Sequence, residues 1–278
     1  MMTWSAWPDD QQAATEVPRN SGHPPPFHHI DEPVREGFFM ARGDLKKCER
    51  VALVIDSPGG QAKAAYQIAT ILRRHAGGFV AVVPRYAKSA ATLLALGADE
   101  IYMSEDAELG PLDAQLFDND REDYSSALDE VQALERLNVA ALEQADQAMM
   151  MLVSRTGKKI ETLLPLALKF SSDMMRPLLE NIDTVHYIKQ SRILRVAEEY
   201  AQRLLQRNYD TGPSKVISAH FVNNYPEHGF IIDRDETGEW LTLAETTDTQ
   251  EGVIDRLGEI ITRKHITAIG RIIKMEGS

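Results

Sequence analysis

Ser89 is the residue of this sequence whose surroundings best suit covalent chemistry. It follows Lys88 and precedes Ala90 in the stretch AKSAAT, where an apolar β-type run changes into an apolar helical run. Serine is a preferred N-cap residue, so Ser89 could simply begin the helix. The alanines around it, however, leave space over the hydroxyl for a substrate, and the first N–H of a helix can stabilise an oxyanion. Ser89 is therefore a candidate nucleophile.

A glycine pair, Gly59-Gly60, lies upstream of Ser89 at the end of another β-type run, in the stretch DSPGG. Glycine adopts backbone conformations that other residues avoid and lets the main chain approach a ligand closely. Exposed N–H groups just before a helix form a site for an anion or an oxyanion. A tight strand-to-helix turn is the simpler interpretation of the same residues.

The elements that would position these two loops alternate between strand and helix. The residue pattern predicts strands over 51–55, 79–83 and 101–103, and helices over 62–75 and 90–96. This order predicts an α/β fold with a parallel sheet and right-handed βαβ crossovers. Because ligands bind at the ends of parallel strands, we expect the two loops to lie side by side.

The rest of the chain suggests three regions. We expect a disordered N-terminal arm over 1–29, rich in proline and polar residues, whose histidines indicate a tail rather than a metal site. Residues 30–232 would form the main domain, with an added helical segment over about 124–208, and 233–278 would be a C-terminal extension ending in an amphipathic helix. Within the main domain, 216–233 mixes β-type residues with turns, and Met149–Met151 is expected to be core filler or a subunit contact.

Composition restricts the classes of function. The chain has 278 residues, 43% of them hydrophobic, and a net charge of −12, which argues against nucleic acid or an anionic membrane as a partner. No apolar run is long enough to span a membrane, and no signal peptide begins the sequence. The single cysteine, Cys48, cannot form an internal disulfide and favours a cytoplasmic location. Neither a nicotinamide fingerprint nor an ATP-binding P-loop is present, and no cofactor is expected.

Three stretches in order, SPGG, VPRYAKSAATLLALGADEIYM and ELGPLDAQ, resemble the serine dehydrogenase proteinase family. This family is related to the signal peptide peptidase SppA and to ClpP within the ClpP/crotonase superfamily. The resemblance is strong over about residues 50–115 and weaker in AEEYAQRLL and YPEHGFIIDRDE.

The resemblance implies a ClpP/crotonase-like fold and a metal-independent serine endopeptidase. Ser89 matches the nucleophile, which attacks a peptide carbonyl to give an acyl-enzyme. Gly59, Gly60 and Ala90 match the oxyanion hole, in which each donor contributes roughly 2.7–4 kcal/mol. The superfamily also implies a ring-shaped homo-oligomer whose chamber admits short or unfolded peptides.

The general base is the least defined part of this prediction. The stretch MSEDAELGPLDAQ, which corresponds to the segment that carries the histidine of ClpP, holds no histidine, and this favours a Ser-Lys dyad like that of SppA. Lys189 is the candidate base, because it lies in a predicted helix downstream of the core. The amine of Lys88 should diverge from Ser89 and bind a carbonyl or an acidic neighbour across a subunit contact. The other lysines considered are Lys158, Lys159 and Lys169.

A histidine base stays open as an alternative, with candidates His186, His220 and His228. His228 lies in the turn-like stretch YPEHGF and could instead be structural. Asp113 could cap a helix or pair with another residue at the cleft, whereas Asp99 and Glu100 are expected to order the turn after Gly97.

Two other functions fit the sequence. A crotonase-like acyl-CoA enzyme would use the same paired N–H groups, but no pair of acidic residues is placed for water addition and the serine would be idle. The second alternative is a non-catalytic oligomeric scaffold, that is, a peptidase-like protein that has lost its general base. A reactive Ser89 would contradict both alternatives.

Overall fold

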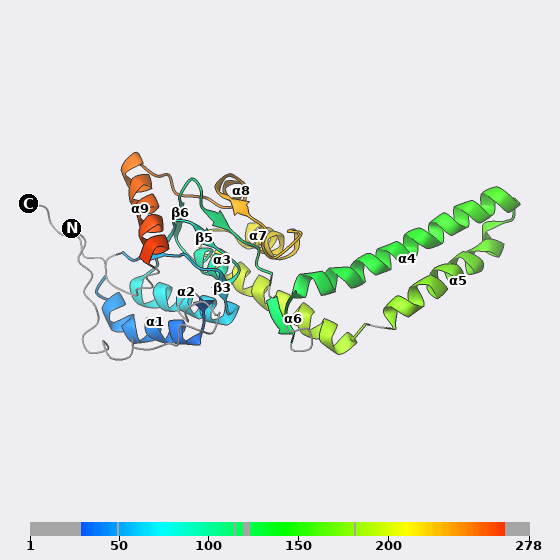
Figure 1. The fold of residues 1–278 in the computed structure, drawn as a ribbon, viewed down its shortest axis with the longest axis horizontal. Coiled ribbons are helices and arrows are strands. Elements are labelled where there is room, and N and C mark those ends of the chain that lie inside the picture. Colours follow the sequence, from blue (N-terminus) through cyan, green and yellow to red (C-terminus); the bar gives the residue numbers. More distant parts are fainter. Residues whose placement is uncertain (1–28, 49, 114, 119–122, 181, 265–278) are drawn as a thin grey trace, which may run out of the picture.

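Three parallel strands form the centre of the α/β body in the computed structural model, which describes residues 29–48, 50–113, 115–118, 123–180 and 182–264 (Figure 1). The strands are β2 (Ala52–Val54), β4 (Val80–Val83) and β6 (Glu100–Met103), in the order β2-β4-β6. Their register aligns Leu53 with Ala81 and Ala81 with Ile101. The predicted strands and their parallel arrangement are confirmed.

Two helices connect these strands, as predicted. The helix α2 (Ala62–Ala76) ends at Gly77, whose φ of 75° is a left-handed conformation that glycine adopts without strain. The short helix α3 (Ala90–Ala95) is buried along its whole length. The helix α1 (Glu32–Leu45), which the Asp31 carboxylate caps by accepting the Val34 N–H at 3.0 Å, packs on α2.

A smaller sheet joins distant parts of the chain. The strand β7 (Glu108–Leu109) pairs in parallel with β5 (Tyr86–Ala87) and antiparallel with β10 (Ile232–Asp233). A separate pair joins β1 (His29–Ile30) to β3 (Gly59–Gly60). The strand β7 therefore brings the segment before β10 next to the strand that leads into Ser89.

A helical hairpin projects from the body (Figure 1). It consists of α4 (Ala127–Thr156) and α5 (Ile160–Leu179), and α6 (Thr184–Leu205) returns to the body and packs on α2 and α3. These helices confirm the predicted helical segment. The antiparallel pair β8 (Gln115–Asp118) and β9 (Asp123–Ser126) precedes α4 and was not predicted.

The prediction of β-type structure and turns over 216–233 is wrong for its first half, because α7 (Thr211–Asn223) continues through it. Valine and isoleucine favour strands, but here packing against the rest of the fold stabilises a helix instead. Ile217 and Phe221 lie one helical turn apart and are both buried, and α7 packs along α6.

The C-terminal part carries two more helices, α8 (Arg234–Trp240) and α9 (Asp248–Lys264), the second of which agrees with the predicted amphipathic helix. Asp255 of α9 accepts a hydrogen bond from the Ser104 hydroxyl at 2.5 Å. Arg234 forms an ion pair with Glu251 at 2.8 Å. These contacts hold α9 against the body.

Three further predictions concern exposed or terminal residues. The predicted arm lies outside the described residues except for His29, which belongs to β1. Met150 and Met151 are 65% and 47% exposed, so the core-filler interpretation is wrong for both. No described helix combines the length and apolar character that a bilayer-spanning segment needs.

Candidate active site

The backbone of Ser89 distinguishes a simple helix cap from a nucleophile. Among the described residues other than glycine, Ser89 alone has a positive φ, of 50°, with a ψ of −116°. Its side chain occupies the N-cap position of α3 but makes no capping hydrogen bond. Holding a residue in such a backbone conformation costs about 1–3 kcal/mol. Sharp, strained strand-to-helix turns present the serine of other hydrolases to substrate in this way.

The Gly59-Gly60 loop packs directly against this turn, as the sequence predicted. A methyl group on Gly59 would lie 2.5 Å from the Lys88 carbonyl oxygen, 2.9 Å from the Ser89 Cβ and 3.1 Å from the Ala90 nitrogen. The Ser57 N–H donates to the Tyr86 carbonyl at 3.1 Å, and the Lys88 N–H donates to the Ser57 carbonyl at 3.0 Å. Main-chain hydrogen bonds therefore join the two loops.

The three predicted oxyanion donors differ in their surroundings. The Gly59 N–H donates to the Ser57 hydroxyl at 3.1 Å and is thus engaged inside its own loop. The Gln61 N–H donates to the Ile30 carbonyl of β1 at 2.7 Å. Gly60 lies between these two donors, pairs with Ile30 of β1 and has a φ of 141°. The Ala90 N–H begins α3 and has no acceptor one turn earlier within that helix.

An ion pair that the sequence analysis missed anchors the glycine loop. Asp56 accepts two hydrogen bonds from the Arg85 guanidinium, at 2.6 and 2.7 Å, and its carboxylate is 6% exposed. The hydrogen bond to Asp56 raises the pKa of Arg85. The pair joins the residue before Ser57 to the residue before β5. In the sequence, this ion pair could have been inferred from an acidic residue before SPGG and a basic residue after the next strand.

Lys88 points away from Ser89, as expected. Its ammonium lies 2.8 Å from a Glu108 carboxylate oxygen and donates to the Leu109 carbonyl at 3.1 Å and the Phe230 carbonyl at 3.3 Å. These partners lie within the same chain, whereas an acidic partner was expected across a subunit contact. Lys88 links the strand before Ser89 to the loop that contains His228.

Asp113 and His228 lie beside each other in this part of the fold. The Asp113 carboxylate is 1% exposed and its second oxygen is 3.9 Å from the His228 Nδ1. The other oxygen accepts the Leu128 N–H at 3.2 Å, so Asp113 both caps α4 and pairs with a neighbour. Among the described residues, the buried Nδ1 atom of His228 has no hydrogen-bond partner at shorter range.

Hydrogen bonds place the Asp113 segment next to the first turn of α3. The Thr92 hydroxyl, three residues after Ser89, donates to the Gly110 carbonyl at 2.8 Å. The Leu112 N–H donates to the Phe221 carbonyl at 2.8 Å. Ser89, Asp113 and His228 thus come from three segments that β7 and its flanking residues hold together.

The lysines predicted as candidate bases lie on the helical hairpin and α6. Lys189 is exposed on α6, where its charge adds to two backbone hydrogen bonds that lower the pKa of Asp183. Lys158 and Lys159 are exposed between α4 and α5, and Lys169 pairs with Asp173 at 3.0 Å. Lys189 as the general base stays a prediction.

The other two candidate histidines make structural contacts. His186 shares a hydrogen bond of 2.9 Å with Gln190 on the same helix. His220 stacks on Trp240 with ring centroids 3.7 Å apart and shares a 3.0 Å hydrogen bond with the Tyr225 hydroxyl. Burial lowers the pKa of His220, which keeps it neutral inside this aromatic cluster.

Asp99 has the ordering role that the sequence suggested. Its carboxylate accepts the Phe79 N–H at 2.9 Å and pairs with Arg207 of the loop after α6. It therefore fixes the turn between α3 and β6 and joins that turn to α6.

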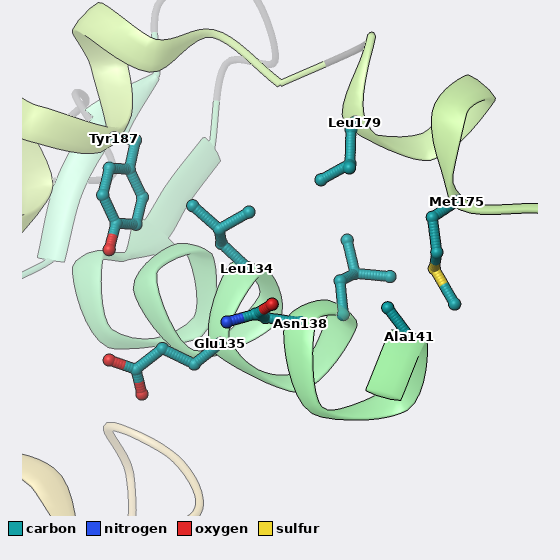
Figure 2. Close-up of a pocket in the computed structure, with 8 residues that line it drawn as sticks. Leu134, Glu135, Asn138, Ala141, Met175, Leu179 and Tyr187 are labelled. Carbon is teal, nitrogen blue, oxygen red and sulfur yellow. The ribbon is translucent and has the colours of Figure 1, made fainter. Parts of the chain in front are cut away.

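A shallow apolar hollow of about 340 Å³ lies between α4, α5 and the start of α6. Figure 2 shows Leu134, Ala141, Met175 and Leu179 around it, with Tyr187 at one end and the polar Glu135 and Asn138 at its margin. Ser89 does not line this hollow. Within the described residues, no cluster of histidine, cysteine and acidic side chains is arranged to bind a metal ion.

The geometry agrees with a comparison of the sequence with protein families. The ClpP-like SDH-type serine proteinase family matches residues 35–175, about half of the chain. The chain belongs to this family. The match includes Ser89, the glycine loop and Asp113, and it ends before His228. The chain has the mixed α/β fold with parallel strands that was predicted, and the family to which it belongs is one of serine proteinases.

Two uncharacterized proteins of Methanocaldococcus jannaschii, MJ0137 and MJ1495, are similar to part of this chain. They are 49% and 44% identical to it over 70 and 66 residues. The matched stretch is about a quarter of this chain and about a quarter of each relative.

Among solved structures, this chain is similar to two mutants of the 1510-N membrane-bound stomatin-specific protease. A serine-to-alanine mutant is 13% identical with a TM-score of 0.46, covering 80% of this chain and 77% of the other. A lysine-to-alanine mutant in complex with a substrate peptide is 14% identical with a TM-score of 0.46, covering 80% and 73%.

Proposed function

We propose that this protein hydrolyses peptide bonds through an acyl-enzyme on Ser89, as a serine endopeptidase that uses no metal ion. The observation that carries the proposal is the positive φ of Ser89, which cannot be explained by capping because the side chain caps nothing. The Ser89 turn lies directly against the glycine loop. The family is one of serine proteinases, and the strained, uncapped Ser89 lies within the residues that match it.

We assign the base to His228 and its orientation to Asp113. Serine needs a base to become a good nucleophile, and a buried carboxylate beside the imidazole can hold the ring and stabilise its charged form. The 3.9 Å separation of Asp113 and His228 is longer than a hydrogen bond, but such contacts often tighten only when substrate binds. Sequence order, Ser89 before Asp113 before His228, differs from that of ClpP.

In the first step, the Ser89 Oγ attacks the peptide carbonyl and its proton passes to the imidazole of His228. The Gly60 and Ala90 N–H groups stabilise the oxyanion, since the Gly59 N–H is engaged with Ser57. The imidazolium then gives its proton to the leaving amine, and the carbon–nitrogen bond breaks. In the second step, water loses a proton to His228 and attacks the acyl-enzyme, which releases the acid and restores Ser89.

The lysine base of the sequence analysis is the alternative within the same reaction. Lys189 would have to lose its proton to act, yet its side chain is exposed to water. The substrate would be a short or unfolded peptide, and the chain would act as a homo-oligomer in the cytoplasm, as the family resemblance implied.

The first test is the intact mass of the folded protein after exposure to a fluorophosphonate. We expect one adduct on the wild-type chain and none on Ser89→Ala, because only an activated hydroxyl reacts quickly with this probe. The matched control is Ser104→Ala, which removes a serine hydroxyl bonded to Asp255 outside the site and should leave the adduct. An unlabelled wild-type protein with a folded circular dichroism spectrum would favour the scaffold or acyl-binding function instead.

Lys88 gives a second prediction, because its ammonium holds the loop that contains His228. We expect Lys88→Met to slow fluorophosphonate labelling of Ser89 by about tenfold, since each lost charge-assisted hydrogen bond contributes roughly 1.5–3 kcal/mol to the loop. Lys88→Arg keeps the cation and should retain more of the rate. Equal losses in both variants would show that the effect comes from packing of the aliphatic part of the Lys88 side chain against Gly110.

A further inference from the structure

The C-terminal helix α9 lies against the turn from which the nucleophile segment begins. Gly258 of α9 is buried, and a methyl group added to it would lie 3.3 Å from the Arg85 Cγ and 3.4 Å from the Pro84 Cβ. A larger side chain at this position would therefore push α9 away from these two residues. Glycine is unfavourable in the interior of a helix, and here it is the residue that permits the close approach of α9.

Arg85 is also the residue that holds the glycine loop. Its guanidinium donates two hydrogen bonds to Asp56, whose carboxylate is 6% exposed. Asp56 directly precedes Ser57, which bonds through its main chain to the segment before Ser89. The ion pair thus lies where both loops begin, because Arg85 starts the segment that leads to Ser89 and Asp56 starts the glycine loop.

The other end of the same face of α9 is tied to the segment that carries His228. Glu251 accepts a hydrogen bond from Arg234 at 2.8 Å, and Arg234 directly follows β10. Glu251, Ile254 and Gly258 have the spacing of one helix face, and Ile254 is 5% exposed. Glu251 and Gly258 are about 10 Å apart along the helix axis. The helix α9 therefore connects the nucleophile side of the proposed site to the base side.

We propose that α9 is a positioning helix for Ser89: its contact at Gly258 keeps Arg85 in place, and Arg85 in turn fixes the glycine loop. The inference rests on the proposed function, since it concerns the same nucleophile and the same oxyanion donors. Because separating a buried carboxylate from its cation is unfavourable, Asp56 would follow a displaced Arg85 and carry the glycine loop with it. A misplacement of about 1 Å at a reacting centre can slow a reaction about a hundredfold.

Two polar contacts keep α9 on the body when the contact at Gly258 is weakened. Asp255 accepts a hydrogen bond from the Ser104 hydroxyl at 2.5 Å, and the Ala244 N–H, just before α9, donates to the Ile101 carbonyl at 2.9 Å. A substitution at Gly258 is therefore expected to shift the helix rather than release it. Ser104→Ala leaves the Gly258 contact intact and stays a control for adduct formation.

The test compares leucine at two glycines of α9 by the second-order rate of fluorophosphonate labelling of Ser89. Gly258→Leu should slow labelling at least about tenfold, because the helix must move away from Arg85. Gly252→Leu is the matched control, since Gly252 lies on the same helix and an added methyl group there would meet nothing within 4 Å. It should label within about twofold of the wild type.

A milder pair of variants keeps the test decisive if the leucine variant does not fold. Gly258→Ala adds one methyl group 3.3 Å from the Arg85 Cγ, so a small shift of the Arg85 side chain accommodates it and the chain should stay folded. We expect labelling about threefold slower than in the wild type, against no change for Gly252→Ala. Circular dichroism and urea unfolding identify the folded variants.

Two measurements separate positioning from a loss of stability. The double variant Gly258→Leu/Asp56→Asn should label no more slowly than the slower single variant, whereas independent effects would multiply. With a fluorogenic peptide, kcat should fall and KM should stay within about twofold, because α9 acts through Arg85 and not on the substrate. A rise in KM alone would mean that α9 contacts the peptide, and it would overturn the positioning role.

Other outcomes distinguish this inference from the proposed function. Equal labelling of the wild type and of a folded Gly258→Leu variant would overturn the inference and leave the proposed function standing. Multiplying effects in the double variant would do the same. An unlabelled wild type would overturn the proposed function, and this inference with it.

Discussion

The variant His228→Gln is expected to slow acylation of Ser89 by about 1,000-fold or more, while the chain stays folded. Glutamine fills similar space, but it cannot accept the serine proton, and removal of a catalytic base typically costs orders of magnitude in rate. The second-order rate of fluorophosphonate labelling measures this step directly. Cleavage of fluorescein-labelled casein by the same preparations measures the complete reaction.

The matched control is Lys189→Met, which removes the alternative base from an exposed position. We expect its labelling rate to stay within about twofold of the wild type, as is usual for an exposed side chain away from the chemistry. If instead Lys189→Met abolished labelling and His228→Gln did not, the base would be a lysine and Asp113 with His228 would be structural.

The second large effect is expected for Gly59→Ala. The new methyl group would lie 2.5 Å from the Lys88 carbonyl and 3.1 Å from the Ala90 nitrogen, and the residue has a φ of 107°. We expect the free energy of unfolding to fall by about 3 kcal/mol, because both the strained backbone and the contact with main-chain atoms are unfavourable. Labelling of Ser89 should fall below detection, since the methyl group also crowds the Ala90 N–H.

Urea unfolding followed by circular dichroism checks the stability, and intact mass checks the labelling. Gly77→Ala is the comparison, because Gly77 also has a positive φ, of 75°, but its added methyl group would meet nothing within 4 Å. It should cost about 1 kcal/mol and leave labelling unchanged. Similar losses in the two variants would mean that Gly59 acts only through its backbone conformation and not through contact with the Ser89 turn.

Local patterns in the sequence predicted the centre of this fold well. The strands β2, β4 and β6 and the helices between them lie within a residue or two of their expected positions, because apolar periodicity and the glycine after α2 are local signals. The approach of Gly59 to Ser89 also followed from sequence, since consecutive loops at the ends of parallel strands are neighbours.

Features that depend on distant contacts were not predicted. The helix α7 contains several β-branched residues, and its helical state depends on packing against α6 and the core. The pairing of Asp113 with His228 joins residues more than 100 positions apart, and nothing near either residue indicates the other. The strand β7, only two residues long, is too short to give a periodic signal, although it decides which segments meet at the site.

The position of β7 between β5 and β10 has a consequence for the timing of activity. The Lys88 ammonium and the Phe230 carbonyl, which this small sheet brings within 3.3 Å, are 142 residues apart in the chain. During synthesis, the nucleophile turn and the glycine loop emerge long before the segment that carries the proposed base. A chain still being translated would therefore hold an unactivated serine, and peptidase activity would begin only when β10 has added to β7. On the proposed mechanism, a newly made chain would not cleave its neighbours on the ribosome before its own fold is complete.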